Sequence, residues 1–110
     1  MCVPDPSEGG PSWQNLPVTR GCFVCGINNP TGLQLTLLSD GRTVEVPVQF
    51  RSEHCGFTGV VHGGLLTTVL DEVMAWVIGV NTRSFAFAAE LNVRFSRSVA
   101  PGVPMKVRAE

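Results

Sequence analysis

The sequence predicts an α+β domain in which one long helix packs against a mainly antiparallel sheet. Segments with an apolar residue at every second position flank a single segment whose apolar residues recur at helical spacing. The alternating segments are short and are bounded by Gly, Pro, Ser and Asn, which is typical of strands joined by turns. The expected order is strand, strand, helix, strand, strand, and the sequence has no internal repeat.

The composition limits the class of protein and its partners. A chain of 110 residues is the size of one domain, and 44% hydrophobic against 15% charged residues is typical of a globular protein. The net charge is −1 with Lys and Arg scattered, so we expect no nucleic-acid partner. The N-terminus does not resemble a secretory signal, and the apolar run 65–80 is too short and too polar to span a bilayer. We therefore expect a cytoplasmic protein with no membrane partner.

The first two strands are predicted to form a β-hairpin. Residues 1–20 are rich in Pro and Gly, with Trp13 as an anchor, and are expected to form a flexible arm before a domain at 21–110. Apolar and polar residues alternate in LQLTL and again in VEVPVQF, and the turn sequence Ser-Asp-Gly-Arg lies between them. Pro47 lacks an N–H donor, which indicates an edge strand or a bulge.

The helix and the later strands follow from their periodicity. Apolar residues at 66, 69, 70, 73, 74, 77 and 78 predict about four helical turns that Gly79 and Asn81 end. The faces of this helix are mostly apolar, so other structure is expected to cover it. The strict alternation of AELNVRFSR, residues 89–97, predicts the clearest strand of the chain, and 103–110 predicts one more.

The helix is entered through His62, Gly63 and Gly64. The first N–H groups of a helix have no internal acceptor, and two glycines let a ligand oxygen approach them. Such donors can stabilise the negative charge that develops in acyl transfer. The alternative is a loop-to-helix turn that needs glycine for its backbone angles.

Two adjacent carboxylates, Asp71 and Glu72, interrupt the apolar run. A carboxylate in an apolar environment costs several kcal/mol unless it is paired, solvated or protonated. Helical spacing aligns Thr67 with Asp71 and Thr68 with Glu72, so simple exposure on a narrow polar strip is an alternative to function. Asp71 is eight residues after Gly63, about 12 Å along the helix, and cannot act at its own helix N-terminus. If both serve one site, a second copy of the chain must supply one of them.

The sequence GVVHGGLLTTVLDEVMAW, followed by AELNVRFSRSVAPG, resembles the hotdog-fold acyl-CoA thioesterases. In that family HGG opens the central helix and an acid lies nine residues after the His, which is Asp71 here. The upstream CFVCGINNPTGLQL resembles the opening of a subgroup of these small proteins, and the resemblance covers about 20–110. It implies a hotdog fold, in which a mainly antiparallel sheet wraps a long central helix. It also implies an acyl-CoA substrate, a homodimer or dimer of dimers, and no cofactor.

The resemblance also implies roles for particular residues. Gly63 and Gly64 would polarise the thioester carbonyl, and Asp71 of the partner subunit would act as general base or nucleophile. His62 would shape the helix entrance rather than take the proton. Further candidates for substrate contacts are His54, Thr67 and Glu72, with Arg94, Arg97 and Lys106 for the phosphates of coenzyme A unless they are simply solvated. Met74, Trp76 and Phe85 suggest an apolar pocket or core packing.

Three features depart from the family pattern. Gly56 stands where many relatives have Asn or Gln, although His54 nearby could compensate, and Ala88 stands where many have Ser or Thr. The chain also ends before the last two strands of a usual hotdog domain, so we expect a C-terminally short domain. A non-catalytic module of hotdog fold that binds acyl-CoA or mediates dimerisation is therefore the alternative to a thioesterase.

The cysteines predict no metal site. Cys22 and Cys25 form one CxxC pair, whereas structural zinc normally has four ligands, and Cys55, His54 and His62 are scattered in the sequence. We expect reduced thiols buried in a turn rather than disulfides or a redox pair. A small zinc-stabilised interaction domain is the remaining alternative.

Overall fold

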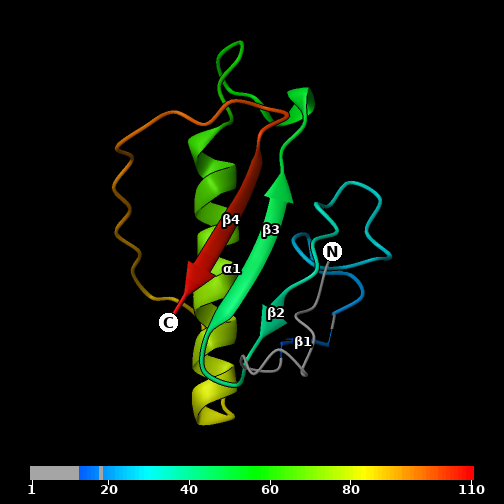
Figure 1. Cartoon of the computed structure of the whole chain (residues 1–110), viewed down its shortest axis with the longest axis vertical. Helices are drawn as coiled ribbons and strands as arrows, with labels where there is room; N and C mark the ends of the chain where they lie inside the picture. The colour runs from blue at the N-terminus through cyan, green and yellow to red at the C-terminus, as the bar shows by residue number, and fades with distance from the viewer. Residues whose placement is uncertain (1–12, 18) are drawn as a thin grey trace.

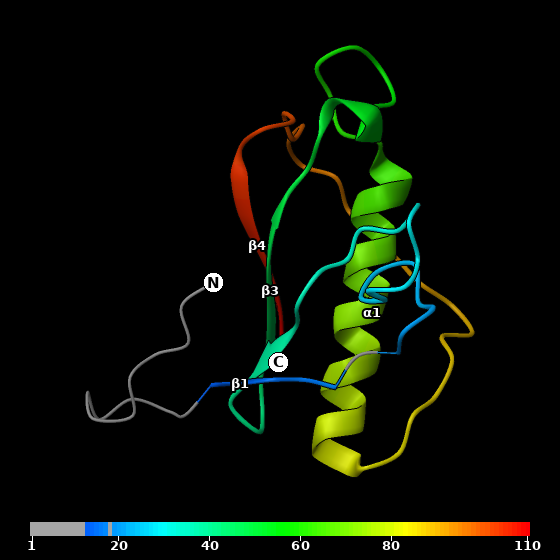
Figure 2. The ribbon, with the colours of Figure 1, turned by 90° about the vertical axis from the view of Figure 1, so that its right-hand side faces the viewer.

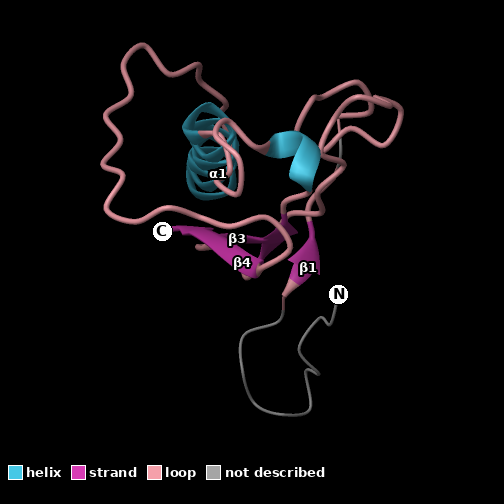
Figure 3. Ribbon diagram, turned by 90° about the horizontal axis from the view of Figure 1, so that it is seen from above, coloured by secondary structure: helices cyan, strands magenta, loops and turns pink. Residues whose placement is uncertain are grey.

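The computed structural model describes residues 13–17 and 19–110, and its centre is one antiparallel sheet. The sheet has its strands in sequence order: β1 (Gln14–Asn15), β2 (Leu38–Ser39), β3 (Val44–Gln49) and β4 (Pro104–Ala109). Helix α1 (Gly63–Thr82) lies along β3 and β4, on one face of the sheet (Figures 1 and 3). The short 3-10 helix η2 (Ser52–His54) follows β3. The predicted fold class, one long helix on an antiparallel sheet, is confirmed.

The hairpin between β2 and β3 is confirmed, and its turn is held by Asp40. The Oδ1 atom of Asp40 accepts hydrogen bonds from the N–H of Arg42 at 2.9 Å and of Thr43 at 2.7 Å. Gly41 has φ +97°, a left-handed conformation that glycine adopts without strain. The alternation of β3 then places Val44, Val46 and Val48 in the core.

The first strand of the hairpin is shorter than predicted and begins later. Strand pairing is confined to Leu38–Ser39, and the predicted segment 33–37 lies outside it. Gln34 has φ +52°, which breaks the extended geometry. The N–H groups of Leu33 and Leu35 donate to the carbonyls of Phe23 and Val24 instead of to a neighbouring strand of the sheet.

Strand β3 lies inside the strand order, yet Pro47 occupies a position with one strand neighbour. Pairing with β2 reaches only Glu45, whereas pairing with β4 continues to Gln49. Pro47 is opposite Lys106 of β4 and has no β2 residue on its other side. At Pro47, strand β3 is therefore an edge of the sheet on the β2 side, as the missing N–H donor predicts.

Helix α1 is longer than predicted. It runs past Gly79 and Asn81 to Thr82, where Arg83 takes the left-handed conformation and its N–H donates to the carbonyl of Gly79 at 2.8 Å. Gly79 has a packing role instead, because a Cβ there would lie 2.5 Å from Cε1 of Phe85. The prediction that Gly79 and Asn81 end the helix is therefore wrong, because Gly79 is needed for the close contact with Phe85 inside the helix.

The helix is covered mainly on the side that faces the sheet. Val69 and Val73 lie in the core with the valines of β3, whereas Ile78 is exposed. The 20 residues of α1 are long and apolar enough, by length and composition alone, to cross a membrane, contrary to the argument from the run 65–80. The core helix of a globular domain meets the same criteria, and α1 joins the core of the sheet through Val69 and Val73.

The predicted strand 89–97 is absent from the described structure. Residues 83–103 instead form a long connection without regular structure that runs beside α1 and leads to β4 (Figure 1). Leu91 and Phe95, on the apolar side of the expected strand, are 37% and 56% exposed. Alternation indicates one apolar side, but a strand also needs a hydrogen-bonded neighbour, and no described segment pairs with 89–97.

The segment before β2 covers another side of the helix. Of the predicted arm, residues 1–12 and 18 lie outside the described part of the chain, and Gln14–Asn15 pair with β2 as β1. From there the chain forms loops that lie beside α1, in front of it in Figure 2. These loops carry Cys22 and Cys25 to the middle of the helix.

Candidate active site

The entrance of α1 is capped by His62. Its Nδ1 atom accepts a hydrogen bond from the N–H of Gly64 at 2.8 Å. A Cβ on Gly64 would lie 2.9 Å from this nitrogen, so the cap needs glycine at this position. The N–H of Gly63 has no acceptor among the described residues, and the ring of Phe95 lies 3.4 Å from where a Gly63 Cβ would be. One of the two expected backbone donors is therefore engaged and the other is available.

His54 supports the same entrance from the preceding loop. Its Nδ1 accepts from the N–H of Arg51 at 2.9 Å, and its carbonyl accepts from the N–H of His62 at 2.8 Å. The imidazole packs edge-on against Phe50, with ring centroids 5.8 Å apart. His54 therefore holds the loop before the helix, and it does not line the cavity that contains Asp71.

A cavity of about 460 Å³ lies beside the middle of α1. Its walls come from α1, from the loop of Thr19 and Cys22, and from residues 85–88 of the long connection. Trp76 and Phe85 meet edge to face in this wall, with ring centroids 5.0 Å apart. The apolar pocket suggested by these two aromatic residues is present.

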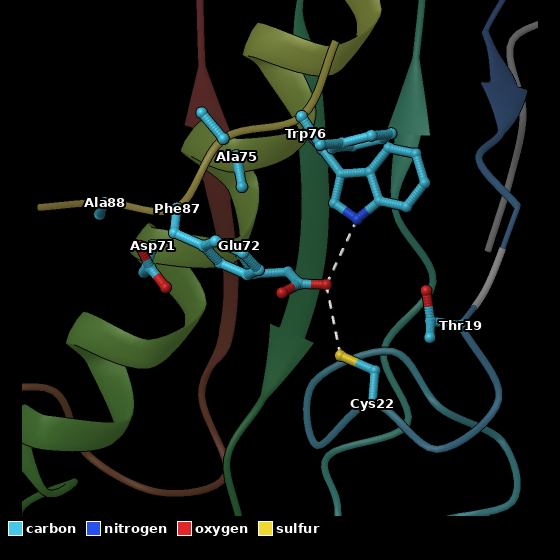
Figure 4. Close-up of a pocket in the computed structure, with 10 residues that line it drawn as sticks. Thr19, Cys22, Asp71, Glu72, Ala75, Trp76, Phe87 and Ala88 are labelled. Carbon is cyan, nitrogen blue, oxygen red and sulfur yellow. Dashed lines mark hydrogen bonds between the residues drawn. The ribbon is translucent and has the colours of Figure 1, made fainter.

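Asp71 and Glu72 have opposite surroundings although they are adjacent. Asp71 is exposed, has no hydrogen-bond donor among the described residues, and also lines two further hollows between α1 and residues 86–92. The side chain of Glu72 extends toward Cys22 on the other side of the cavity wall (Figure 4). Of these two adjacent residues, Asp71 is therefore the one that presents a free carboxylate to a bound molecule.

Glu72 is the centre of a half-buried polar cluster. Its Oε1 atom accepts from the thiols of Cys22 and Cys25, each at 3.4 Å, and from Nε1 of Trp76 at 3.3 Å. Burial raises the pKa of the Cys25 thiol to about 12, and the contacts with Cys22 and Glu72 act in the same direction. The Cys25 thiol is therefore a protonated donor to a carboxylate. The sequence-based candidate ligands Cys55, His54 and His62 lie outside this cluster.

The remaining predicted site residues are Thr67 on α1, Arg94 and Arg97 on the long connection, and Lys106 on β4. The hydroxyl of Thr67 donates to the carbonyl of Gly63 at 2.9 Å, although Thr67 and Asp71 also line one of the shallow hollows. Arg94 and Arg97 are exposed on the long connection, outside the cavity lining and without an ion pair among the described residues. Lys106, in contrast, pairs with Glu45 at 3.5 Å.

The contact of Glu72 with the two cysteines was not predicted from the sequence. It joins residues 50 and 47 positions apart, and no local pattern reports such a contact. The one local signal is Trp76, four residues after Glu72 and thus on the same side of the helix.

Comparison with known proteins agrees with this architecture. The model of the thioesterase superfamily matches residues 58–110. The crystal structure of a thioesterase superfamily protein is 29% identical, with a TM-score of 0.72, over 83% of this chain and 45% of that chain. No curated protein matches the sequence. The match covers less than half the length of the chain in that crystal structure.

Together the fold and the matches define the class of the protein. A single long helix that begins with HGG and packs on an antiparallel sheet is the hotdog fold. The segment from residue 58 to 110, which contains α1 and β4, is similar to the thioesterase superfamily.

Proposed function

We propose that this protein hydrolyses an acyl-CoA thioester to the free acid and coenzyme A. The observation that carries the proposal is the position of Asp71, an exposed carboxylate at the mouth of an apolar cavity on the helix that HGG opens. The match of residues 58–110 to the model of the thioesterase superfamily supports the reaction type.

In the proposed reaction the thioester carbonyl lies at the N-terminus of α1. The N–H of Gly63 donates to the carbonyl oxygen, where negative charge develops. The N–H of Gly64 joins it when His62 releases its hydrogen bond. His62 thus controls the entrance and takes no proton.

Asp71 of the partner subunit completes the proposed site. About 12 Å of helix separates Gly63 from Asp71 of the same chain, so an antiparallel arrangement of two α1 helices is needed to bring the two together. As a base, Asp71 takes a proton from water while the water oxygen bonds to the carbonyl carbon, and the carbon–sulfur bond then breaks. As a nucleophile, it forms an acyl anhydride with loss of the thiolate, and water then hydrolyses the anhydride.

Exposed apolar side chains support the homodimer. They lie on α1 and on the long connection beside it and include Ile78, Phe85, Phe87, Leu91 and Phe95. A second copy, or a dimer of dimers, would cover such a surface. Arg94 and Arg97, exposed on the same connection, would meet the phosphates of coenzyme A.

The first experiment measures thiol release from acyl-CoAs of short, aromatic and long acyl groups. It compares the wild-type chain with Asp71→Asn, and uses Glu53→Gln, an exposed carboxylate outside the cavity, as the matched control. We expect Asp71→Asn to lose at least about a hundredfold in kcat, the lower range for general acid–base catalysis, and Glu53→Gln to retain it. Equal turnover in wild type and Asp71→Asn, with both folded, contradicts the proposed role.

A second experiment asks whether the site is shared between subunits. Gly63→Val should block the approach to the helix N-terminus, and Asp71→Asn removes the carboxylate. Mixing the two inactive variants should restore about one quarter of wild-type activity, because half of randomly formed dimers are mixed and each has one intact site. No recovery, with subunit exchange verified, would place both residues of a site on one chain.

A non-catalytic acyl-CoA-binding module is the second candidate function. Ala88 lies in the cavity wall, where it offers no hydroxyl to position water. Tight binding of acyl-CoA with no thiol release, and with Asp71→Asn unchanged in affinity, would favour the module.

A further inference from the structure

Cys22, Cys25 and Glu72 form a convergent set of metal-ligand atoms in the described part of the chain. Their two sulfurs and one carboxylate oxygen all lie within 4.8 Å of one another. Cys25 is buried, whereas Cys22 and Glu72 are half-buried and reach the wall of the cavity. The atoms come from two elements distant in sequence, the loop before β2 and the middle of α1, so helical or turn spacing alone does not explain their meeting.

The distances fit tetrahedral coordination. With zinc–sulfur bonds of about 2.3 Å and zinc–oxygen bonds of about 2.0–2.2 Å, the sulfur-to-oxygen edge of a tetrahedron is about 3.5–3.7 Å and the sulfur-to-sulfur edge about 3.8 Å. Both sulfur-to-oxygen distances are 3.4 Å. The two sulfurs, less than 4.8 Å apart, need to approach by at most about 1 Å.

The loop that carries the cysteines is a turn closed by backbone hydrogen bonds. The N–H of Gly26 donates to the carbonyl of Cys22 at 2.8 Å, and the N–H of Val24 donates to its sulfur at 3.4 Å. A Cβ on Gly26 would lie 2.4 Å from the carbonyl oxygens of Arg20 and Cys22. The turn therefore requires glycine after the second cysteine, and it supplies an N–H to a sulfur that carries charge when it binds a cation.

The carboxylate is oriented by a second contact. Nε1 of Trp76 donates to Oε1 of Glu72 at 3.3 Å, one turn further along α1 (Figure 4). Hydrogen bonds of this kind fix the direction of a ligand and are typical of the surroundings of protein metal sites.

We propose that Cys22, Cys25 and Glu72 bind Zn²⁺, with the fourth position of the ion open to the cavity. On binding, each thiol transfers its proton to solvent and its sulfur bonds to the ion. Two thiolates, one carboxylate and Zn²⁺ carry a net charge of −1, the same as the metal-free cluster of one carboxylate and two thiols. Occupation of the half-buried cluster thus adds no net charge to it.

The test uses the full chain, reduced and stripped with a chelator, and titrates it with Co²⁺ and then Zn²⁺. We expect about one ion per chain and a thiolate-to-cobalt absorption band that Zn²⁺ abolishes. Cys22→Ser and Glu72→Gln should each weaken binding about tenfold or more, whereas Cys55→Ser, the matched control, should bind like wild type. No uptake by the wild-type chain, or uptake that both Cys22→Ser and Glu72→Gln retain, overturns the proposal.

A second measurement needs no substitution and so does not depend on the variants folding. Zn²⁺ should slow the alkylation of Cys22 and Cys25 in the folded wild-type chain, read peptide by peptide, and should leave the rate at Cys55 unchanged. Equal rates with and without Zn²⁺ contradict the site. A disulfide between Cys22 and Cys25 in the isolated protein, with no cation bound after reduction, would define a redox pair in its place.

Discussion

Replacement of His62 by alanine tests the cap at the entrance of α1. The substitution removes the acceptor of the Gly64 N–H, a hydrogen bond of 2.8 Å. Loss of an N-cap side chain costs about 1 kcal/mol, within a range of roughly 0.5–2 kcal/mol. For a domain of this size that corresponds to a fall in Tm of about 4–8 °C.

The matched variant is His62→Asn, because asparagine is a strong N-cap residue. Both variants lose the packing of the imidazole against Gly56, where a Cβ would lie 3.2 Å from the His62 Cδ2 atom. The difference between them therefore isolates the hydrogen bond. Urea denaturation followed by circular dichroism gives the free energy of unfolding of each chain. If His62→Asn is destabilised as much as His62→Ala, the cap does not stabilise the helix and the reasoning is refuted.

Three further predictions concern the turn, the buried thiol and the close contact at Gly79. Hydrogen bonds from backbone N–H groups hold the pKa of Asp40 below its usual value. The stabilising effect of this carboxylate is therefore present above the unfolded pKa and is lost as pH falls. Asp40→Ala should lower the free energy of unfolding by about 1 kcal/mol at neutral pH and flatten the acid side of a plot of urea midpoint against pH. Burial raises the pKa of the Cys25 thiol from 9.0 to about 12. The contribution of the buried neutral thiol to stability is therefore present at lower pH and is lost as pH rises across this interval. In metal-free protein, Cys25 should be alkylated more slowly than Cys55 near about pH 8.5, and equal rates would contradict the burial. Gly79→Ala gains up to about 1 kcal/mol of helix propensity but must displace Phe85. The free energy of unfolding should therefore change little, while the near-ultraviolet circular dichroism of the aromatic wall decreases. An unchanged spectrum would show that Phe85 does not pack there.

The elements that the sequence predicts correctly are those that have both a local signal and a partner to pair with or pack on in the described structure. The turn sequence around Asp40 and the alternation of β3 predicted the hairpin, and apolar residues at helical spacing predicted α1. The strand predicted at 103–110 is β4, which pairs with β3 along its whole length.

The errors arise where a local pattern depends on a distant partner. The segment 89–97 has the alternation of a strand but no described strand pairs with it. Gly79 looked like a helix end because its close contact with Phe85 is not visible in the sequence. For the same reason the carboxylate of Glu72 gave no indication that two cysteines of another loop surround it. The HGG entrance and Asp71, in contrast, are candidates because they lie in one continuous stretch that resembles a known family.

The sheet narrows sharply from one side to the other. Strands β3 and β4 pair over six residues each, whereas β1 and β2 pair over only two. Few backbone hydrogen bonds hold the narrow side, so it can open without disturbing the rest of the domain. In native-state hydrogen exchange the amides of β1 and β2 should therefore exchange well before those of β3 and the buried turns of α1, which open only when the whole domain unfolds.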